Sequence, residues 1–143
     1  EGAPEEGSKG WKPIEYIEGR VMPHTLTAYY RMADLALVSS VYDGMNLVAK
    51  EYVASQVDET GVLVVSHLAG AAEELKGALV VNPYDQEGMV DAIRRALEMP
   101  EIERRERMWL MRDHLSTHDI YHWAERCLCD GDIEVAHLQN VPG

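Results

Sequence analysis

The sequence predicts an α/β fold with a parallel sheet and flanking helices. Short, continuous apolar runs recur along the chain, as in strands that are buried on both faces. These runs are Leu35–Val38, Val62–Val65 and Leu79–Val81. Segments with a helical spacing of apolar residues separate the runs, and strands that alternate with helices form parallel sheets. A chain of 143 residues suits one such domain, of the Rossmann-like kind, with a core of its own.

Two elements are expected before the first buried strand. Residues 1–10 are rich in glycine, proline and glutamate, which predicts a flexible N-terminal segment. Pro13–Ile17 alternates apolar and polar residues, which predicts a short strand. After Pro23, Thr25 is suited to cap a helix that continues to Met32.

The central part of the chain predicts three helices. The first runs over Gly44–Gln56, directly after the first buried strand. Ala69–Ala72 leads into a short helix that ends with Gly77 as its C′ residue. Asp85 is a favourable N-cap for the third helix, Gln86–Met99, whose apolar residues form one stripe.

A further helix is expected to start at Pro100. The glutamates and arginines over residues 101–107 favour a solvated helix face with i,i+4 pairs. Trp109 and Trp123 are interpreted as core residues or interdomain contacts, and Asp119 as the cap of a last helix. After Cys129 the pattern ends.

The candidate site is the stretch Asp43–Glu51, where a strand, a short turn with a glycine and a helix start follow one another. The N–H groups of a first helical turn are free, and the helix dipole places partial positive charge there. Gly44 lets a phosphate approach the backbone closely, and Asp43 is suited to cap the helix or to bind a hydroxyl. Residues 67–70 and 82–85 follow the next two strands, so all three loops are expected at the carboxyl edge of the sheet, where ligands bind.

Composition excludes several classes of function. The formal net charge of −12 opposes binding to nucleic acid or to an anionic membrane, so a phosphate site would need local positive potential from backbone dipoles or from residues elsewhere. No apolar run approaches the roughly 20 residues of a membrane helix. Cys127 and Cys129 are one residue apart and are poor disulfide partners, which favours free thiols and a cytoplasmic location. The absence of a G-x-G-x-x-G string argues against an unrelated dinucleotide-binding protein.

Three histidines recur at four-residue spacing. On one continuous helix, His114, His118 and His122 would form a stripe suited to zinc. Residues 116–119 indicate a helix break and cap, which would scatter them. The sequence therefore predicts no metal site.

Several separate blocks, in the same order, resemble the trehalose-phosphate synthases, which are retaining glucosyltransferases of the GT-B fold. The blocks are Asp43–Tyr52, Gly61–Ser66, Ala69–Leu75, Val81–Asp85 and His118–Ile120. Tyr42 departs from the arginine that is common before the aspartate. The resemblance implies a nucleotide-sugar-binding Rossmann-like domain over residues 11–128, as part of the C-terminal half of a GT-B enzyme, followed by a tail over 129–143.

The resemblance also implies roles for the candidate site. The backbone N–H groups of Asn46, Leu47 and Val48 would hold the donor diphosphate. Asp43, Gly44 and Met45 would lie against the donor glucose, with Asp43 as the catalytic candidate. Glu51 would accept hydrogen bonds from the ribose hydroxyls; taken by itself, it fits equally a surface residue paired with a lysine or arginine.

The activity implied is transfer of glucose, with retention, from a nucleoside-diphosphate glucose to glucose 6-phosphate. UDP-glucose is the expected donor, and no metal or cofactor is expected, because helix dipoles and basic side chains stabilise the leaving diphosphate. The family's basic pair and its acceptor residues would precede Trp11. We therefore expect the acceptor sugar phosphate to bind through a missing N-terminal domain, and the fragment alone to be inactive. Two alternative functions remain: a glucosylglycerol-phosphate synthase and a non-catalytic regulatory module. Assembly into a homo-oligomer is also expected to be possible.

Overall fold

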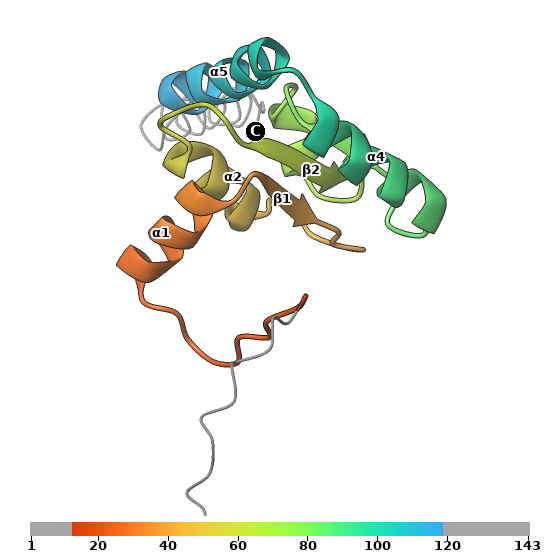
Figure 1. The fold of residues 1–143 in the computed structure, drawn as a ribbon, viewed down its shortest axis with the longest axis horizontal. Coiled ribbons are helices and arrows are strands. Elements are labelled where there is room, and N and C mark those ends of the chain that lie inside the picture. Colours follow the sequence, from red (N-terminus) through yellow and green to blue (C-terminus); the bar gives the residue numbers. More distant parts are fainter. Residues whose placement is uncertain (1–12, 119–143) are drawn as a thin grey trace, which may run out of the picture.

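The computed structural model describes residues 13–118 (Figure 1). Its sheet has three parallel strands in the order β1-β2-β3, namely β1 (Leu35–Val38), β2 (Val62–Ser66) and β3 (Leu79–Val81). The helices are α1 (Pro23–Met32), α2 (Leu47–Ser55), α3 (Ala71–Glu74), α4 (Gln86–Glu98) and α5 (Glu101–Thr117). The predicted α/β class and the three predicted strands are confirmed.

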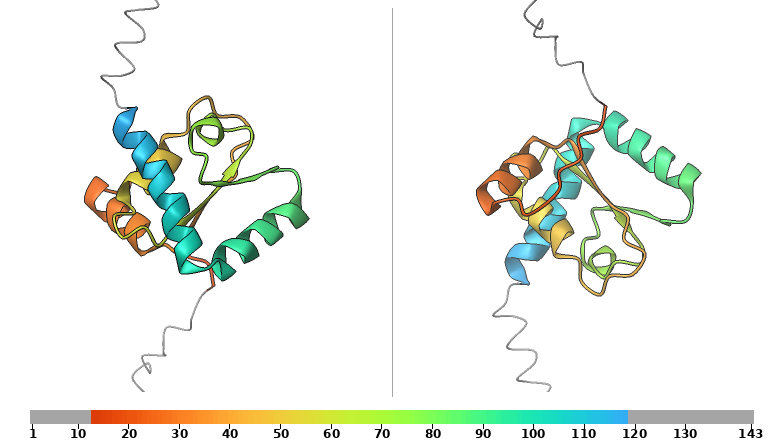
Figure 2. Two further views of the ribbon diagram at one scale, coloured as in Figure 1. Left: turned by 90° about the horizontal axis from the view of Figure 1, so that it is seen from above. Right: turned by 90° about the horizontal axis from the view of Figure 1, so that it is seen from below.

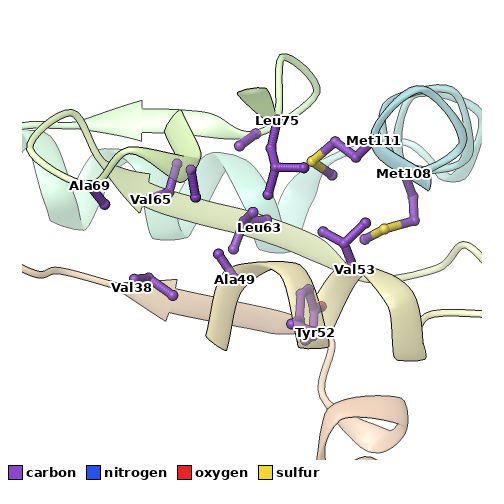
Figure 3. Close-up of a cluster of buried hydrophobic side chains, with 12 residues drawn as sticks. Val38, Ala49, Tyr52, Val53, Leu63, Val65, Ala69, Leu75, Met108 and Met111 are labelled. Atoms are coloured by element: carbon purple, nitrogen blue, oxygen red, sulfur yellow. The ribbon is translucent and has the colours of Figure 1, made fainter. Parts of the chain in front are cut away.

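Helices cover both faces of the sheet, and β2 lies at its centre. All five residues of β2 are buried. Leu63 and Val65 pack into a cluster with residues of α2 and α5, whereas Val62 and Val64 pack against α4. Figure 2 shows α4 on the opposite side of the sheet from α2 and α5. Figure 3 shows the larger cluster, in which Met108 and Met111 of α5 reach toward Leu75 and Val53. Because side chains alternate along a strand, one strand supplies both halves of the core.

Burial on both faces was expected of all three strands, and it holds only for β2. Leu37 of β1 and Val80 of β3 are exposed, the latter by 54%. The helices pack over the centre of the sheet and leave these positions on the outer strands open to solvent.

The predicted strand at Pro13–Ile17 is wrong. No strand forms there, and Ile14 and Tyr16 are about four-fifths exposed (79% and 83%). An extended segment becomes a strand only when a neighbour accepts and donates its ladder hydrogen bonds. Within residues 13–118 this segment has no strand beside it.

Two helix termini differ from prediction at the start of the fold. Helix α1 begins at Pro23 and not after Thr25, because proline is favourable in the first helical position, where its missing N–H is not needed. Helix α3 ends at Glu74 with Leu75 as its C-cap, so Gly77 is not a C′ residue. A Cβ added at Gly77 would lie 2.2 Å from the carbonyl oxygen of Arg107, so Gly77 gives room to α5.

The last two helices follow the predictions more closely. The Asp85 side chain caps α4 by accepting a hydrogen bond from the Gly88 N–H at 3.0 Å. Along α5, Arg105 pairs with Glu101 and Arg107 with Glu103, both at 2.8 Å with i,i+4 spacing. These three predictions are confirmed.

Helix α5 ends at Thr117 with His118 as its C-cap, within the predicted break at residues 116–119. Trp109 on this helix is 57% exposed, so the interpretation as a core residue is wrong, and an interdomain contact stays a prediction. Asp119, Trp123, Cys127 and the predicted domain boundaries near residues 10 and 128 lie outside the described residues. None of the helices within residues 13–118 is long and apolar enough to cross a membrane.

Candidate functional site

The loops that follow the three strands lie side by side at the carboxyl edge of the sheet. Asp43, after β1, forms a parallel bridge with Ala69, after β2. The N–H of His67, at the end of β2, donates to the carbonyl of Val81 at 2.9 Å. The predicted convergence of these loops is confirmed, because the strands are parallel and adjacent.

The loop between β1 and α2 is built around the carboxylate of Asp43. Its Oδ1 accepts hydrogen bonds from the backbone N–H groups of Met45 (3.2 Å) and Asn46 (2.9 Å). Its Oδ2 accepts a third, at 2.8 Å, from the side-chain amide of Asn46. The Asn46 amide, followed by the Met45 N–H, lowers the pKa of Asp43 below its usual value. Asp43 is therefore an ionised residue that shapes the turn.

Asn46, not Asp43, caps helix α2. Its Oδ1 accepts a hydrogen bond from the Ala49 N–H at 2.8 Å, and its side-chain amide also donates to the Ser40 hydroxyl at 3.3 Å. The residue is buried and has a left-handed backbone, with φ 63°, which asparagine tolerates better than most residues. Helix α2 therefore begins at Leu47, and the predicted start at Gly44 is wrong. Asparagine's strength as an N-cap was the signal in the sequence.

The start of α2 presents backbone N–H groups to solvent. Those of Leu47 and Val48 lie in its first turn and have no acceptor among residues 13–118, and both side chains are largely exposed. The Asn46 N–H, the third donor expected to hold an anion, is already engaged by Asp43. Two of the three predicted donors are thus open, and the dipole of α2 adds partial positive charge at that point.

Gly44 faces open space. An added Cβ would meet no heavy atom of the described residues within 4 Å, and its φ is not in the left-handed range. Neither packing nor backbone conformation therefore requires a glycine here. Met45, the next residue, also exposes its side chain.

Glu51 lies on α2, one turn after the start of the helix, with its carboxylate in solvent. The hydroxyl of Tyr30, from α1, donates to Glu51 Oε2 at 3.2 Å. No lysine or arginine pairs with Glu51 in the part of the chain that the structure describes. Lys9, Lys12 and Arg126 lie outside the described residues, so the alternative of a surface ion pair stays a prediction.

Tyr30 is a neighbour of the site that sequence reasoning missed. Its ring packs edge to face against Tyr52, with ring centroids 6.2 Å apart. Partial burial raises the pKa of Tyr30, and the hydrogen bond to the Glu51 carboxylate raises it further. Nothing in the local sequence relates two residues on separate helices, so only the packing of α1 on α2 reveals the pair.

Lys50 points away from Glu51, as expected from helix geometry, but it is not a free surface residue. Its Nζ lies 2.7 Å from Glu74 Oε2, and its side chain is mostly buried. The pair joins α2 to α3.

Within residues 13–118, no group of three or more histidine, cysteine, aspartate or glutamate side chains could hold a metal ion. His114 and His118 stack with ring centroids 4.1 Å apart. His122 lies outside the described residues, so the predicted absence of a metal site stays a prediction.

Fold and site together define a class: a Rossmann-like α/β domain with an open helix start at the carboxyl edge of its sheet. The model of glycosyltransferase family 20 matches residues 4–131. The chain belongs to glycosyltransferase family 20.

Curated relatives and solved structures agree with this assignment. The chain is 50% identical over 125 residues to the trehalose-6-phosphate synthase of Sinorhizobium fredii, covering 87% of this chain and 27% of that protein. It is 43% identical over 117 residues to an alpha,alpha-trehalose-phosphate synthase [UDP-forming] of Dictyostelium discoideum, covering 82% of this chain and 16% of that one. The chain thus spans about a quarter or less of the length of these relatives.

Two solved structures share the fold. An E. coli structure bound with UDP-2-fluoro glucose matches with a TM-score of 0.80 and 46% identity, over 87% of this chain and 28% of that one. A synthase from Burkholderia xenovorans in complex with glucose-6-phosphate matches with a TM-score of 0.81 and 45% identity, over the same shares of the two chains. The resemblance to trehalose-phosphate synthases and the GT-B assignment are confirmed.

Proposed function

We propose that this chain is the donor-binding part of an α,α-trehalose-phosphate synthase, a glycosyltransferase of the hexosyltransferase class. The reaction is transfer of glucose, with retention, from UDP-glucose to glucose 6-phosphate, which gives trehalose 6-phosphate. The observation that carries the proposal is the start of α2, where the N–H groups of Leu47 and Val48 have no acceptor among the described residues. The exposed carboxylate of Glu51 follows on the same helix, and Gly44, which has free space at its Cβ position, precedes it. The relatives' names, and the UDP-sugar and glucose-6-phosphate in two of the similar structures, support it.

The donor diphosphate lies at the start of α2 in this proposal. The N–H groups of Leu47 and Val48 are available to donate to phosphate oxygens, and the helix dipole favours the negative charge. In a chain with a net charge of −12, this backbone potential is a local source of attraction. It acts most strongly as the diphosphate departs, because negative charge then develops on the leaving oxygen.

The nucleoside extends along α2 toward Glu51. Glu51 is four positions after Leu47, which is a rise of about 6 Å at 1.5 Å per residue. A carboxylate accepts hydrogen bonds on both oxygens, and one oxygen of Glu51 already accepts from Tyr30. The other oxygen, and the free positions of the first, are suited to ribose hydroxyls.

The donor glucose lies against Asp43, Gly44 and Met45. A Cβ at Gly44 would meet no described atom within 4 Å, which leaves this side of the loop open to the sugar, and the turn around Asp43 keeps the loop in place. Both carboxylate oxygens of Asp43 accept hydrogen bonds from the turn, so we assign to Asp43 the role of orienting the loop and the sugar. We propose that glucose 6-phosphate binds to a further part of the enzyme, which corresponds to a region of the longer relatives that this chain does not span. A cytoplasmic location and a homo-oligomer stay predictions from the sequence.

Calorimetric titration of the full-length protein with UDP, GDP and UDP-glucose tests the proposal. We expect binding of UDP and UDP-glucose, weaker binding of GDP, and release of UDP when glucose 6-phosphate is added to the UDP-glucose complex. A folded protein that binds none of the three would contradict the proposal. Preference for GDP would change the donor and leave the reaction class in place.

A further inference from the structure

Gly70, in the loop after β2, lies directly against the loop that carries the candidate site. Its N–H donates to the carbonyl of Asp43 at 3.0 Å. A Cβ added at Gly70 would lie 2.1 Å from the carbonyl oxygen of Gly44 and 2.9 Å from its carbonyl carbon. Both distances are far shorter than van der Waals contact, and both involve backbone, which cannot rotate away as a side chain can.

The requirement for glycine at this position is one of space, not of backbone conformation. Gly70 has φ −56° and ψ −30°, the right-handed helical region that any residue adopts. Alanine would therefore suit the backbone of Gly70 itself. The nearest obstacles to its side chain are atoms of the neighbouring Gly44–Met45 peptide.

Neither loop can move away from the other without losing buried contacts or hydrogen bonds. Ala69 and Ala71, on either side of Gly70, are buried in the larger hydrophobic cluster. On the other side, three hydrogen bonds to the Asp43 carboxylate fix the turn. A side chain at position 70 would therefore press on the peptide between Gly44 and Met45, which has no core contact and is held by the hydrogen bond from the Met45 N–H to Asp43 Oδ1 at 3.2 Å.

We propose that Gly70 is a positioning residue for the donor sugar: it lets the two loops approach closely and so sets where the Gly44–Met45 peptide stands. This inference rests on the proposed function, because it needs a donor whose sugar lies on that peptide. Gly70 touches no substrate and acts through the β1–α2 loop alone.

Gly77 offers a matched control. A Cβ there would also meet a backbone carbonyl, that of Arg107 at 2.2 Å, but it would press on α5 and not on the site. Gly70→Ala and Gly77→Ala thus introduce the same methyl group against the same kind of obstacle. A loss of function that follows general strain would appear in both variants.

The test is calorimetric titration of full-length wild type, Gly70→Ala and Gly77→Ala with UDP and UDP-glucose, at a temperature where circular dichroism shows all three folded. We expect both variants to unfold at lower temperature than wild type. Gly70→Ala should weaken UDP-glucose binding by about tenfold or more and UDP binding by less than about threefold, whereas Gly77→Ala should change neither. Equal weakening of both ligands by Gly70→Ala, or a parallel loss in Gly77→Ala, would overturn the proposal.

A measurement on wild type keeps the proposal testable if Gly70→Ala does not fold. The Gly70 amide should be protected from hydrogen exchange, and UDP-glucose should increase this protection more than UDP does. The buried Gly61 amide, which donates to Gln56 Oε1 at 3.1 Å, is the reference that should respond equally to both. An unprotected Gly70 amide would overturn the positioning role, whereas a protected amide in a protein that binds no UDP-glucose would overturn the proposed function instead.

Discussion

The loops after β1 and β2 each contain a glycine at the candidate site, and the two glycines serve opposite purposes. Gly44 has free space around its Cα, whereas Gly70 has a backbone carbonyl where its side chain would be. The protein requires Gly70 for its own packing. It does not require Gly44, so a requirement there would have to come from a ligand.

Gly44→Val would give the strongest test of this comparison. Because the described residues leave the space open, we expect a thermal unfolding temperature close to that of wild type. The side chain would occupy the space assigned to the donor glucose, so kcat/KM should fall by about a hundredfold or more, equivalent to about 2.7 kcal/mol. Steady-state kinetics with UDP-glucose and glucose 6-phosphate measures it. Turnover at the wild-type rate would show that no ligand approaches Gly44.

Asn46→Ala tests how the β1–α2 loop is held, in comparison with the β3–α4 loop. We expect a loss of about 2 kcal/mol in the free energy of unfolding, because the variant loses a helix cap and places alanine in a left-handed conformation. Asp85→Ala removes the cap of α4 from an extended residue and should cost about 1 kcal/mol. Denaturant unfolding of both variants gives the difference. A smaller loss for Asn46→Ala than for Asp85→Ala would show that the loop is not held through Asn46.

Glu51→Ala separates binding from folding on the open side of the site. Glu51 is exposed and has no cation beside it in the described part of the chain, so its removal should change stability by less than about 0.5 kcal/mol. Donor affinity should fall by about tenfold if the carboxylate binds the ribose.

Tyr30→Phe tests the same part of the site as Glu51→Ala, with a smaller expected effect. It keeps the ring against Tyr52 and removes only the hydroxyl, so UDP affinity should fall by about two- to threefold. Tyr29→Phe, on the same helix, is the control. Unchanged affinity in Glu51→Ala would contradict the ribose role.

The smallest effect concerns the dependence of stability on pH. The pKa of Asp43 is lowered in the folded protein, so its contribution to stability is present above the pKa of an unfolded aspartate, about 3.9, and is lost as pH falls through the folded value. Asp43→Asn should therefore differ most from wild type near neutral pH and approach it as the pH falls through the lowered folded pKa of Asp43. Thermal unfolding of both proteins across this range is the measurement. A difference that is independent of pH would show that the charge of Asp43 does not stabilise the turn.

The main features of the fold could be predicted because they depend on local patterns. Apolar runs of strand length located β1, β2 and β3, and the order of strands and helices indicated that their carboxyl ends meet. The Asp85 cap and the i,i+4 pairs of α5 follow from spacing along one helix.

The details that failed depend on partners distant in the sequence. Pro13–Ile17 has the alternation of a strand but no neighbour within the described residues. The start of α2 depends on the left-handed conformation of Asn46, which the Asp43 carboxylate and the Ser40 hydroxyl stabilise together. The Tyr30–Glu51 contact and the place of Gly70 arise only when helices and loops pack, so no local pattern contains them.

Strand β2 belongs to both hydrophobic clusters, and this has a consequence for how the molecule opens. If α4 detaches, β2 loses its cover on one face and keeps it on the other; the same holds for α2 and α5. The amides of β2 should therefore be the last to exchange with solvent, through complete unfolding and not through partial openings. The loops of the candidate site extend from the end of this strand and its neighbours. Local opening of α4, or of α2 and α5, can then occur while β2 keeps the ends of those loops in place.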